Sequence, residues 1–212
     1  TQRTATLSWE LDGTNTFKIP YDGKPHVPTA TVTNTVGDDK CNVTVSGEQT
    51  DVGTYTATAT GLSNSNYKLP AQKTVTFEIV KAQREAPTSV TATGTTYKGG
   101  TDGKLNNVDS SMEYKKDGEN EWHSITGDTV EGLSTGKYYV RYKDSKNYYA
   151  SSEKDVYIAN GQEIKVNVPA SQVGYTLSVS NTVVDYNESS TLTFKLNKGY
   201  SKTKNFAVKV NG

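Results

Sequence analysis

The sequence predicts an all-β chain built from small β-sandwich modules in tandem, followed by a third, short β segment. Apolar and polar residues alternate along many short segments, and no longer segment repeats its apolar residues with the helical period of about 3.6. One pattern occurs twice, as residues 53–59 followed by Asn66-Tyr67 and as residues 136–142 followed by Asn147-Tyr148. Only 33% of the 212 residues are hydrophobic, which favours thin modules, whose strands keep one face in water, over one deep core.

The first module is expected over residues 1–82. Residues 54–60 show the clearest alternation, with Tyr55 and Ala57 on one face and threonines on the other. Turn sequences such as Asp12-Gly13 separate the alternating segments. The expected strands cover residues 7–11, 17–19, 31–33, 42–45, 53–59 and 74–79.

A polar linker that ends at Pro87 separates this module from a second one, expected over residues 83–160, and from a third segment over residues 161–212. Residues 116–120 form a turn between two alternating segments, which is a strong hairpin signal. The third segment ends on Asn211-Gly212, a favoured hairpin turn, so we expect it to be an incomplete module of a longer protein. The expected strands cover residues 90–92, 112–115, 121–125, 138–142, 155–158, 164–168, 175–179, 192–196 and 206–210.

Charge and motif content argue against several classes of function. The 23 basic residues balance the 23 acidic ones without a basic stripe, so nucleic acid is not expected as a partner. No apolar run approaches the roughly 18 residues of a membrane helix, so no membrane insertion is expected. His26 and His123, both expected at the surface, and Cys41 lack the spacing of metal ligands. Residues 132–136 have the spacing Gly-x-Ser-x-Gly, but they are expected as the connection that leads into the Tyr138 strand and not as a nucleophile elbow. We therefore expect no enzyme activity, no cofactor and no metal.

Two further kinds of site were considered and are not expected. Four Asp-Gly pairs are interpreted as turns, because none fits the pattern of a calcium-binding loop. These pairs are Asp12-Gly13, Asp22-Gly23, Asp102-Gly103 and Asp117-Gly118. A Lys–Asn isopeptide crosslink would need both residues buried beside a carboxylate, and no clear strand shows an inward-facing lysine.

Several strings of the first module carry a resemblance to a known family. They are residues 7–9, 21–34, 43–47, 51–59 and 66–70. Together they resemble the MBG family of Ig-like repeats, found in large surface proteins of Gram-positive bacteria. The resemblance implies an Ig-like β-sandwich, an extracellular location on the cell surface or in secreted form, and a repeat or adhesin context. It brings no catalytic residues. The second module resembles a looser Ig-like or fibronectin-type repeat, carried by Leu133 and residues 136–141.

The duplicated pattern is interpreted as a tyrosine corner in each module. The Tyr55 hydroxyl is expected to hydrogen-bond upstream backbone, with Gly53 supplying the bend, and Tyr138 is expected to do the same in the second module. In the antibody pattern a cysteine stands two residues after the corner tyrosine, where this chain has Ala57 and Val140. Packing alone is therefore expected to join the two sheets.

The candidates for ligand contact are aromatic side chains in polar loops. Trp122, Tyr148 and Tyr149 could stack on a sugar ring or contact a host surface protein. The recurrence of Asn66-Tyr67 as Asn147-Tyr148 favours a loop-forming role for those pairs instead. Tyr149 has no equivalent in the first module, so it is the better candidate.

Three functions remain open from the sequence. The preferred one is a non-catalytic stalk or adhesion scaffold, monomeric within a longer secreted or wall-anchored protein. The second is a module that binds a glycan or a host protein. The third is an accessory region of a secreted glycan-active hydrolase.

Overall fold

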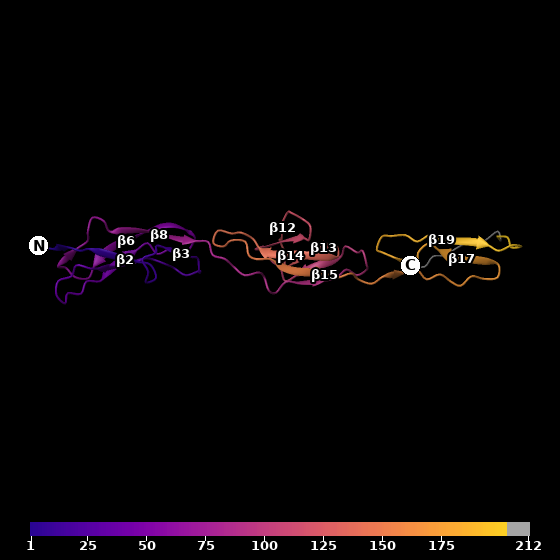
Figure 1. The fold of residues 1–212 in the computed structure, drawn as a ribbon, viewed down its shortest axis with the longest axis horizontal. Coiled ribbons are helices and arrows are strands. Elements are labelled where there is room, and N and C mark those ends of the chain that lie inside the picture. Colours follow the sequence, from indigo (N-terminus) through magenta and orange to yellow (C-terminus); the bar gives the residue numbers. More distant parts are fainter. Residues whose placement is uncertain (203–212) are drawn as a thin grey trace. The chain divides into compact units, whose positions relative to one another are not determined.

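The computed structural model describes residues 1–202 and contains strands but no helix within them, which confirms the all-β class (Figure 1). None of these residues therefore forms a helix able to cross a membrane. The chain forms two compact units. The first comprises Thr1–Ala86 with Arg141–Ser152, and the second comprises Pro87–Val140 with the chain from Glu153 onward. The division into modules at residues 1–82, 83–160 and 161–212 stays a prediction, and the strand expected at 206–210 lies outside the described residues.

The first unit contains a four-stranded sheet of order β3-β8-β6-β5 and two strand pairs, β2-β4 and β1-β7. Its strands are β1 (Arg3–Thr4), β2 (Leu7–Glu10), β3 (Lys18–Pro20), β4 (Thr29–Val32), β5 (Val43–Ser46), β6 (Gly53–Leu62), β7 (Tyr67–Lys68) and β8 (Thr74–Val80). The ten-residue strand β6 runs antiparallel to β8, and the two lie side by side in Figure 1. In contrast, β3 pairs with β8 in parallel.

The core of the first unit follows from the alternation in the sequence. Ala57 and Phe77 point inward from β6 and β8 and are almost fully buried. Leu11 and Ile79 complete the buried cluster, against which Trp9 and other partly buried side chains pack. Because successive strand residues face opposite sides, the intervening threonines of β6 lie toward solvent.

One glycine of this unit is required by a close backbone approach. Gly47 has φ +111°, and a Cβ at this position would lie 2.5 Å from the Thr56 carbonyl oxygen. It follows β5, whose pairing with β6 shifts register between Thr44 and Val45. Only glycine accommodates both the positive φ and the contact.

The second unit contains a three-stranded sheet of order β13-β10-β9, a four-stranded sheet of order β12-β11-β14-β15, and the pairs β16-β18 and β17-β19. Leu105, Val140 and Ile158 are fully buried side chains of this unit. Its strands are β9 (Thr91–Thr93), β10 (Gly103–Asn106), β11 (Met112–Lys116), β12 (His123–Ser124), β13 (Thr129–Leu133), β14 (Gly136–Tyr142), β15 (Lys154–Ile158), β16 (Ile164–Lys165), β17 (Tyr175–Val179), β18 (Val183–Val184) and β19 (Leu192–Leu196).

Two expectations about polar residues are wrong. His26 is not at the surface but only 9% exposed, with its ring nitrogens 2.8 Å from an Asp22 oxygen and 3.3 Å from an Asp12 oxygen. Asp102-Gly103 is not a turn. Gly103 begins β10, and a Cβ there would lie 2.6 Å from the Ile158 Cγ2 atom, so glycine is needed for packing. Asp12-Gly13 is a turn, with positive φ at both residues.

Candidate functional site

The first duplicated motif forms a hydrogen bond of the tyrosine-corner kind. The Tyr55 hydroxyl donates to the Asp51 carbonyl oxygen at 2.9 Å, and its ring packs at 5.8 Å between centroids against Phe77. Gly53 has an ordinary φ, so its role is not to supply a bend. A Cβ at Gly53 would lie 2.7 Å from the Tyr55 hydroxyl oxygen and 2.8 Å from Cζ. Glycine is needed because the tyrosine ring folds back over it.

The second motif repeats this hydrogen bond but not the glycine contact, because a Cβ at Gly136 would meet Lys116 rather than the tyrosine ring. The Tyr138 hydroxyl donates to the Ser134 carbonyl oxygen at 3.0 Å, again four residues upstream, and the ring is 3% exposed. Tyr114 packs against Tyr138 at 6.4 Å between centroids. Burial, followed by the neighbouring Tyr138 and Glu119, raises the pKa of Tyr114 above its ordinary value. Each corner therefore anchors the connection that enters a central strand of its sheet.

The two Asn-Tyr pairs do different things, although their sequences match. Tyr67 is 4% exposed, and its hydroxyl accepts from the Val36 backbone N–H at 2.8 Å and donates to an Asp39 carboxylate oxygen at 3.0 Å. It closes one end of its own sandwich. Tyr148 instead packs edge-on against Tyr21 at 5.1 Å between centroids. The Arg84 guanidinium lies 5.2 Å from the Tyr148 centroid.

Asn147 binds the first tyrosine corner. Its side chain accepts from the Val52 backbone N–H at 3.0 Å and donates to an Asp51 carboxylate oxygen at 2.9 Å. Lys146 donates to the other Asp51 oxygen at 2.6 Å. The hydrogen bond from Lys146, followed by that from Asn147, lowers the pKa of Asp51. The segment Arg141–Ser152 thus belongs to the first unit through specific polar contacts.

The three aromatic candidates for ligand contact have different surroundings. Tyr148 is half-buried by the contacts just described. Tyr149 is 47% exposed, with the Lys81 ammonium 5.7 Å from its ring centroid. Trp122 lies in the second unit, half-buried, with the Lys115 ammonium 4.8 Å from its ring. Of the three, Tyr149 offers the most accessible ring.

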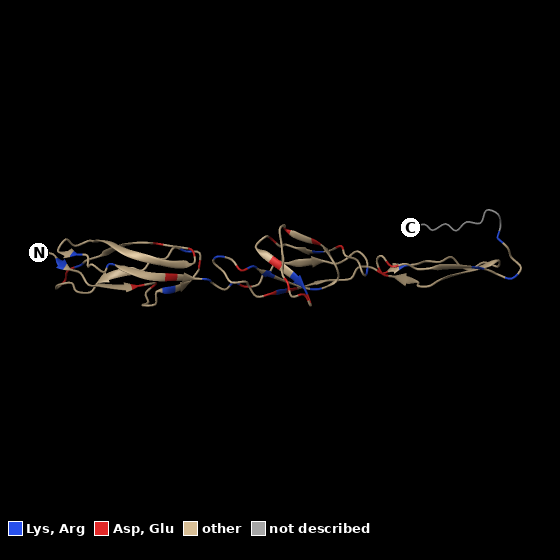
Figure 2. Ribbon diagram, turned by 90° about the horizontal axis from the view of Figure 1, so that it is seen from above, with Lys and Arg blue, Asp and Glu red and all other residues tan. Residues whose placement is uncertain are grey.

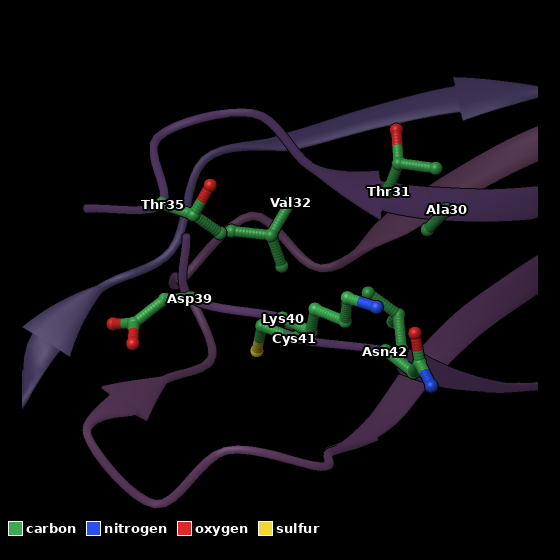
Figure 3. Close-up of a pocket in the computed structure, with 9 residues that line it drawn as sticks. Ala30, Thr31, Val32, Thr35, Asp39, Lys40, Cys41 and Asn42 are labelled. Carbon is green, nitrogen blue, oxygen red and sulfur yellow. The ribbon is translucent and has the colours of Figure 1, made fainter. Parts of the chain in front are cut away.

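A hollow of about 380 Å³ lies at β4, β5 and the loop between them (Figure 3). Its titratable lining residues are Asp39, Lys40 and the free thiol Cys41. Asp39 is already held by Tyr67. In Figure 3 the Asp39 carboxylate points away from the Lys40 amine, so these groups do not converge on one point. The remaining lining residues are Ala30, Thr31, Val32, Thr35, Asn42 and Val43.

Many charged side chains of residues 1–202 form ion pairs. Figure 2 shows both signs interspersed along each unit. Surface pairs such as Lys18–Glu78 at 3.1 Å and Lys137–Asp155 at 2.7 Å link neighbouring strands. Within residues 1–202, no group of three or more His, Cys, Asp or Glu side chains is placed to hold a metal ion.

Sequence reasoning missed a pair of exposed tyrosines in the second unit. Tyr97 and Tyr186 are 41% and 44% exposed, with parallel rings beside a hollow of about 230 Å³. Neither residue lies in a named strand or in the duplicated motif, so no local pattern points to them. Their proximity comes from contacts between segments about 90 residues apart.

Comparison with known proteins assigns a family to part of the first unit. No curated protein matches the chain. Residues 14–77 match the family described as MBG domain (YGX type). The matched segment contains the corner tyrosine Tyr55 and the end-closing tyrosine Tyr67. Residues 14–77 therefore form an MBG domain of the YGX type, as the resemblance in the sequence predicted.

Proposed function

We propose that this chain is a non-catalytic segment of a secreted or wall-anchored surface protein of a Gram-positive bacterium, in which it carries tension as a stalk or adhesion scaffold. The MBG domain supports a role as a repeat module of a surface protein. The extracellular location and the mechanical role are the parts of the proposal that need testing.

The observation that carries the mechanical role is the parallel pairing of β3 with β8. The register joins Lys18 to Glu78 and Ile19 to Ile79. Two further hydrogen bonds flank it, from Tyr21 N–H to the Val80 carbonyl at 2.8 Å and from Glu78 N–H to the Phe17 carbonyl at 2.9 Å. β8 leads out of the MBG domain toward Pro87, and β3 lies near its start.

β1 and β2 precede β3, so tension from the amino end passes them before it reaches β3, and the parallel pair of β3 and β8 is then loaded in a particular way. Tension pulls β3 toward its amino end and β8 toward its carboxyl end, which is along both strands and in opposite directions. The hydrogen bonds between them then share the load, whereas an antiparallel pair pulled from one end opens one bond at a time. A module of this kind resists force better than its equilibrium stability alone suggests, because forced unfolding depends on the unfolding rate.

Single-molecule force spectroscopy on the full chain tests this role. Ile19→Pro weakens β3 by removing a backbone donor, and Val45→Ala on β5, a strand that does not pair with β3, serves as the control. We expect Ile19→Pro to lower the unfolding force of the first module clearly more than Val45→Ala does. Equal forces for the two variants would contradict load-bearing by β3 and β8.

The surface location is tested separately on cells of the source bacterium. Antibodies raised against residues 1–202 should label intact cells, or the protein should be found in the culture medium. Labelling that requires permeabilised cells, with no protein in the medium, would rule out this part of the proposal.

A second candidate function is binding of a glycan or a host protein through Tyr149. Its ring is 47% exposed, and Lys81 beside it can donate hydrogen bonds to a ligand. Tyr149→Ala should then abolish signals on a glycan array and reduce cell adhesion, while leaving the fold unchanged. An array without hits together with unchanged adhesion would remove this candidate.

A further inference from the structure

A small hollow in the second unit has two parallel aromatic walls. The rings of Tyr97 and Tyr186 lie within 4° of parallel, with their centroids 6.5 Å apart. This separation is near the upper end of the range for aromatic pairs, and both side chains stay more than 40% exposed. The hollow of about 230 Å³ is also lined by Thr96, Thr101 and Asp102. Its size suits one side-chain group rather than a large ligand.

Main-chain contacts hold the two walls in place. Tyr186 N–H donates to the Lys98 carbonyl at 2.8 Å, and Lys98 N–H donates to the Gln162 carbonyl at 2.8 Å. A Cβ at Gly161 would lie only 2.1 Å from the Thr95 carbonyl oxygen, so these segments meet at a position that only glycine permits. The tyrosines are therefore positioned by backbone hydrogen bonds and close packing.

Carboxylates outnumber ammonium groups among the charged residues that act on Asp102 and Lys98, although Lys104 also acts on Asp102. Asp102 accepts hydrogen bonds from the Thr96 hydroxyl and, at 3.0 Å, from the Thr96 N–H. The hydrogen bond from the Thr96 hydroxyl, followed by that from the Thr96 N–H, lowers the pKa of Asp102, so its carboxylate is ionised at neutral pH. The Lys98 ammonium is paired with Asp185 at 3.2 Å, and the Lys104 ammonium with Glu131 at 2.6 Å. Two more carboxylates, Glu163 and Glu188, also act on Lys98.

The same chain contains a cation that lies close to two tyrosine rings at once. In the first unit, the Arg84 guanidinium lies 3.5 Å from the Tyr142 ring centroid and 5.2 Å from that of Tyr148. A guanidinium is planar, weakly hydrated and always charged, so it stacks on an aromatic face and pairs with a carboxylate at once. A lysine ammonium lacks the planar surface, and a neutral sugar can donate hydroxyl groups to the carboxylate but forms no ion pair with it.

We propose that the hollow formed by Tyr97, Tyr186 and Asp102 binds an arginine side chain of a partner protein. The guanidinium stacks on the two tyrosine rings, and its N–H groups donate to the Asp102 carboxylate. The site does not depend on the mechanical role proposed above.

The test uses three short peptides that differ at one residue. Acetyl-Gly-Arg-Gly-amide is titrated into the full chain, followed by the same peptide with lysine and with citrulline, the uncharged analogue of arginine. Tyrosine ring signals are followed by NMR. We expect saturable shifts with the arginine peptide and a dissociation constant about fivefold or more below those of the other two peptides.

Variants assign the binding to this hollow. Tyr186→Leu should abolish the shifts, whereas Tyr157→Leu should leave them unchanged, since Tyr157 is 65% exposed and does not line the hollow. Backbone spectra check that both variants remain folded. Three results would each overturn the proposal. The first is equal affinity for the arginine and citrulline peptides, and the second is an equal loss of the shifts in both variants. The third is saturable binding of glucose together with no shifts from the arginine peptide.

Discussion

Replacing Gly53 by alanine tests the physical basis of the first tyrosine corner. On general grounds a glycine-to-alanine change in a strand stabilises a protein by about 0.4–1 kcal/mol, because it restricts the unfolded chain. At Gly53 the change should instead lower the free energy of unfolding. The added Cβ would lie 2.7 Å from the Tyr55 hydroxyl oxygen and 3.1 Å from Cε2, which is too close for a relaxed contact, so the ring must move.

The size of the effect follows from what the displaced ring loses. Its hydrogen bond to the Asp51 carbonyl contributes about 1 kcal/mol. Its packing against Phe77 contributes about 0.5–1.5 kcal/mol more. After subtraction of the general stabilisation of about 0.4–1 kcal/mol, we expect Gly53→Ala to destabilise the first module by about 1–1.5 kcal/mol. For a module of this size that lowers the melting temperature by about 4–12 °C.

Thermal and urea unfolding measure this, with Gly61→Ala as the matched control in the same strand. A Cβ at Gly61 would meet only Thr44 side-chain atoms at 3.8 Å, so this variant should be neutral or slightly stabilising. In a Tyr55→Ala background the clash is absent, and Gly53→Ala should no longer destabilise. The reasoning fails if Gly53→Ala is stabilising in the wild-type background, or if its effect is unchanged in the Tyr55→Ala background.

Three further predictions follow from the same contacts. Tyr138→Phe should lower the stability of the second module by about 1 kcal/mol in urea unfolding through loss of the bond to Ser134, and an unchanged midpoint would contradict this. Asn147→Ala should speed hydrogen exchange at the Val52 amide, which loses its acceptor, while the Tyr21 amide, bonded to Val80, serves as the control. Below about pH 4 the folded chain should lose stability. Several carboxyl groups have a lower pKa in the folded chain than in the unfolded chain, so their ionised form stabilises the fold above the unfolded pKa. This stabilisation is lost as the pH falls through the lower, folded pKa. Urea midpoints that stay constant between about pH 5 and 2 would exclude this contribution. The groups concerned are Asp22, Asp51, Asp102 and Glu119.

Local patterns predicted the strands well because the information lies within a few residues. Alternation along residues 53–59 and 74–79 corresponds to β6 and β8, and their small or apolar residues face the core. The two corner tyrosines were also recognisable, since each hydroxyl binds a carbonyl only four residues upstream. Gly53 was recognised as part of the motif, but its purpose was not, because the position of the tyrosine ring above it is a matter of three-dimensional packing.

Local patterns failed where a residue's partner is distant. Asn66-Tyr67 and Asn147-Tyr148 look equivalent, yet Tyr67 closes its own sandwich and Asn147 binds the corner at Val52, 95 residues away. His26 looked like a surface histidine although Asp22 stands only four residues upstream, because its burial and the contact of its other ring nitrogen with Asp12 depend on the fold.

The all-β class, the main strands, the corner tyrosines and the MBG resemblance of residues 14–77 could be predicted from the residues alone. These depend on short-range periodicity and on motifs whose residues act on near neighbours. Three contacts became visible only in the folded chain, namely the parallel pairing of β3 with β8, the attachment of Asn147 to Asp51 and the meeting of Tyr97 with Tyr186. Such contacts join segments far apart in the chain, and their geometry is selected by how whole sheets pack rather than by any local preference.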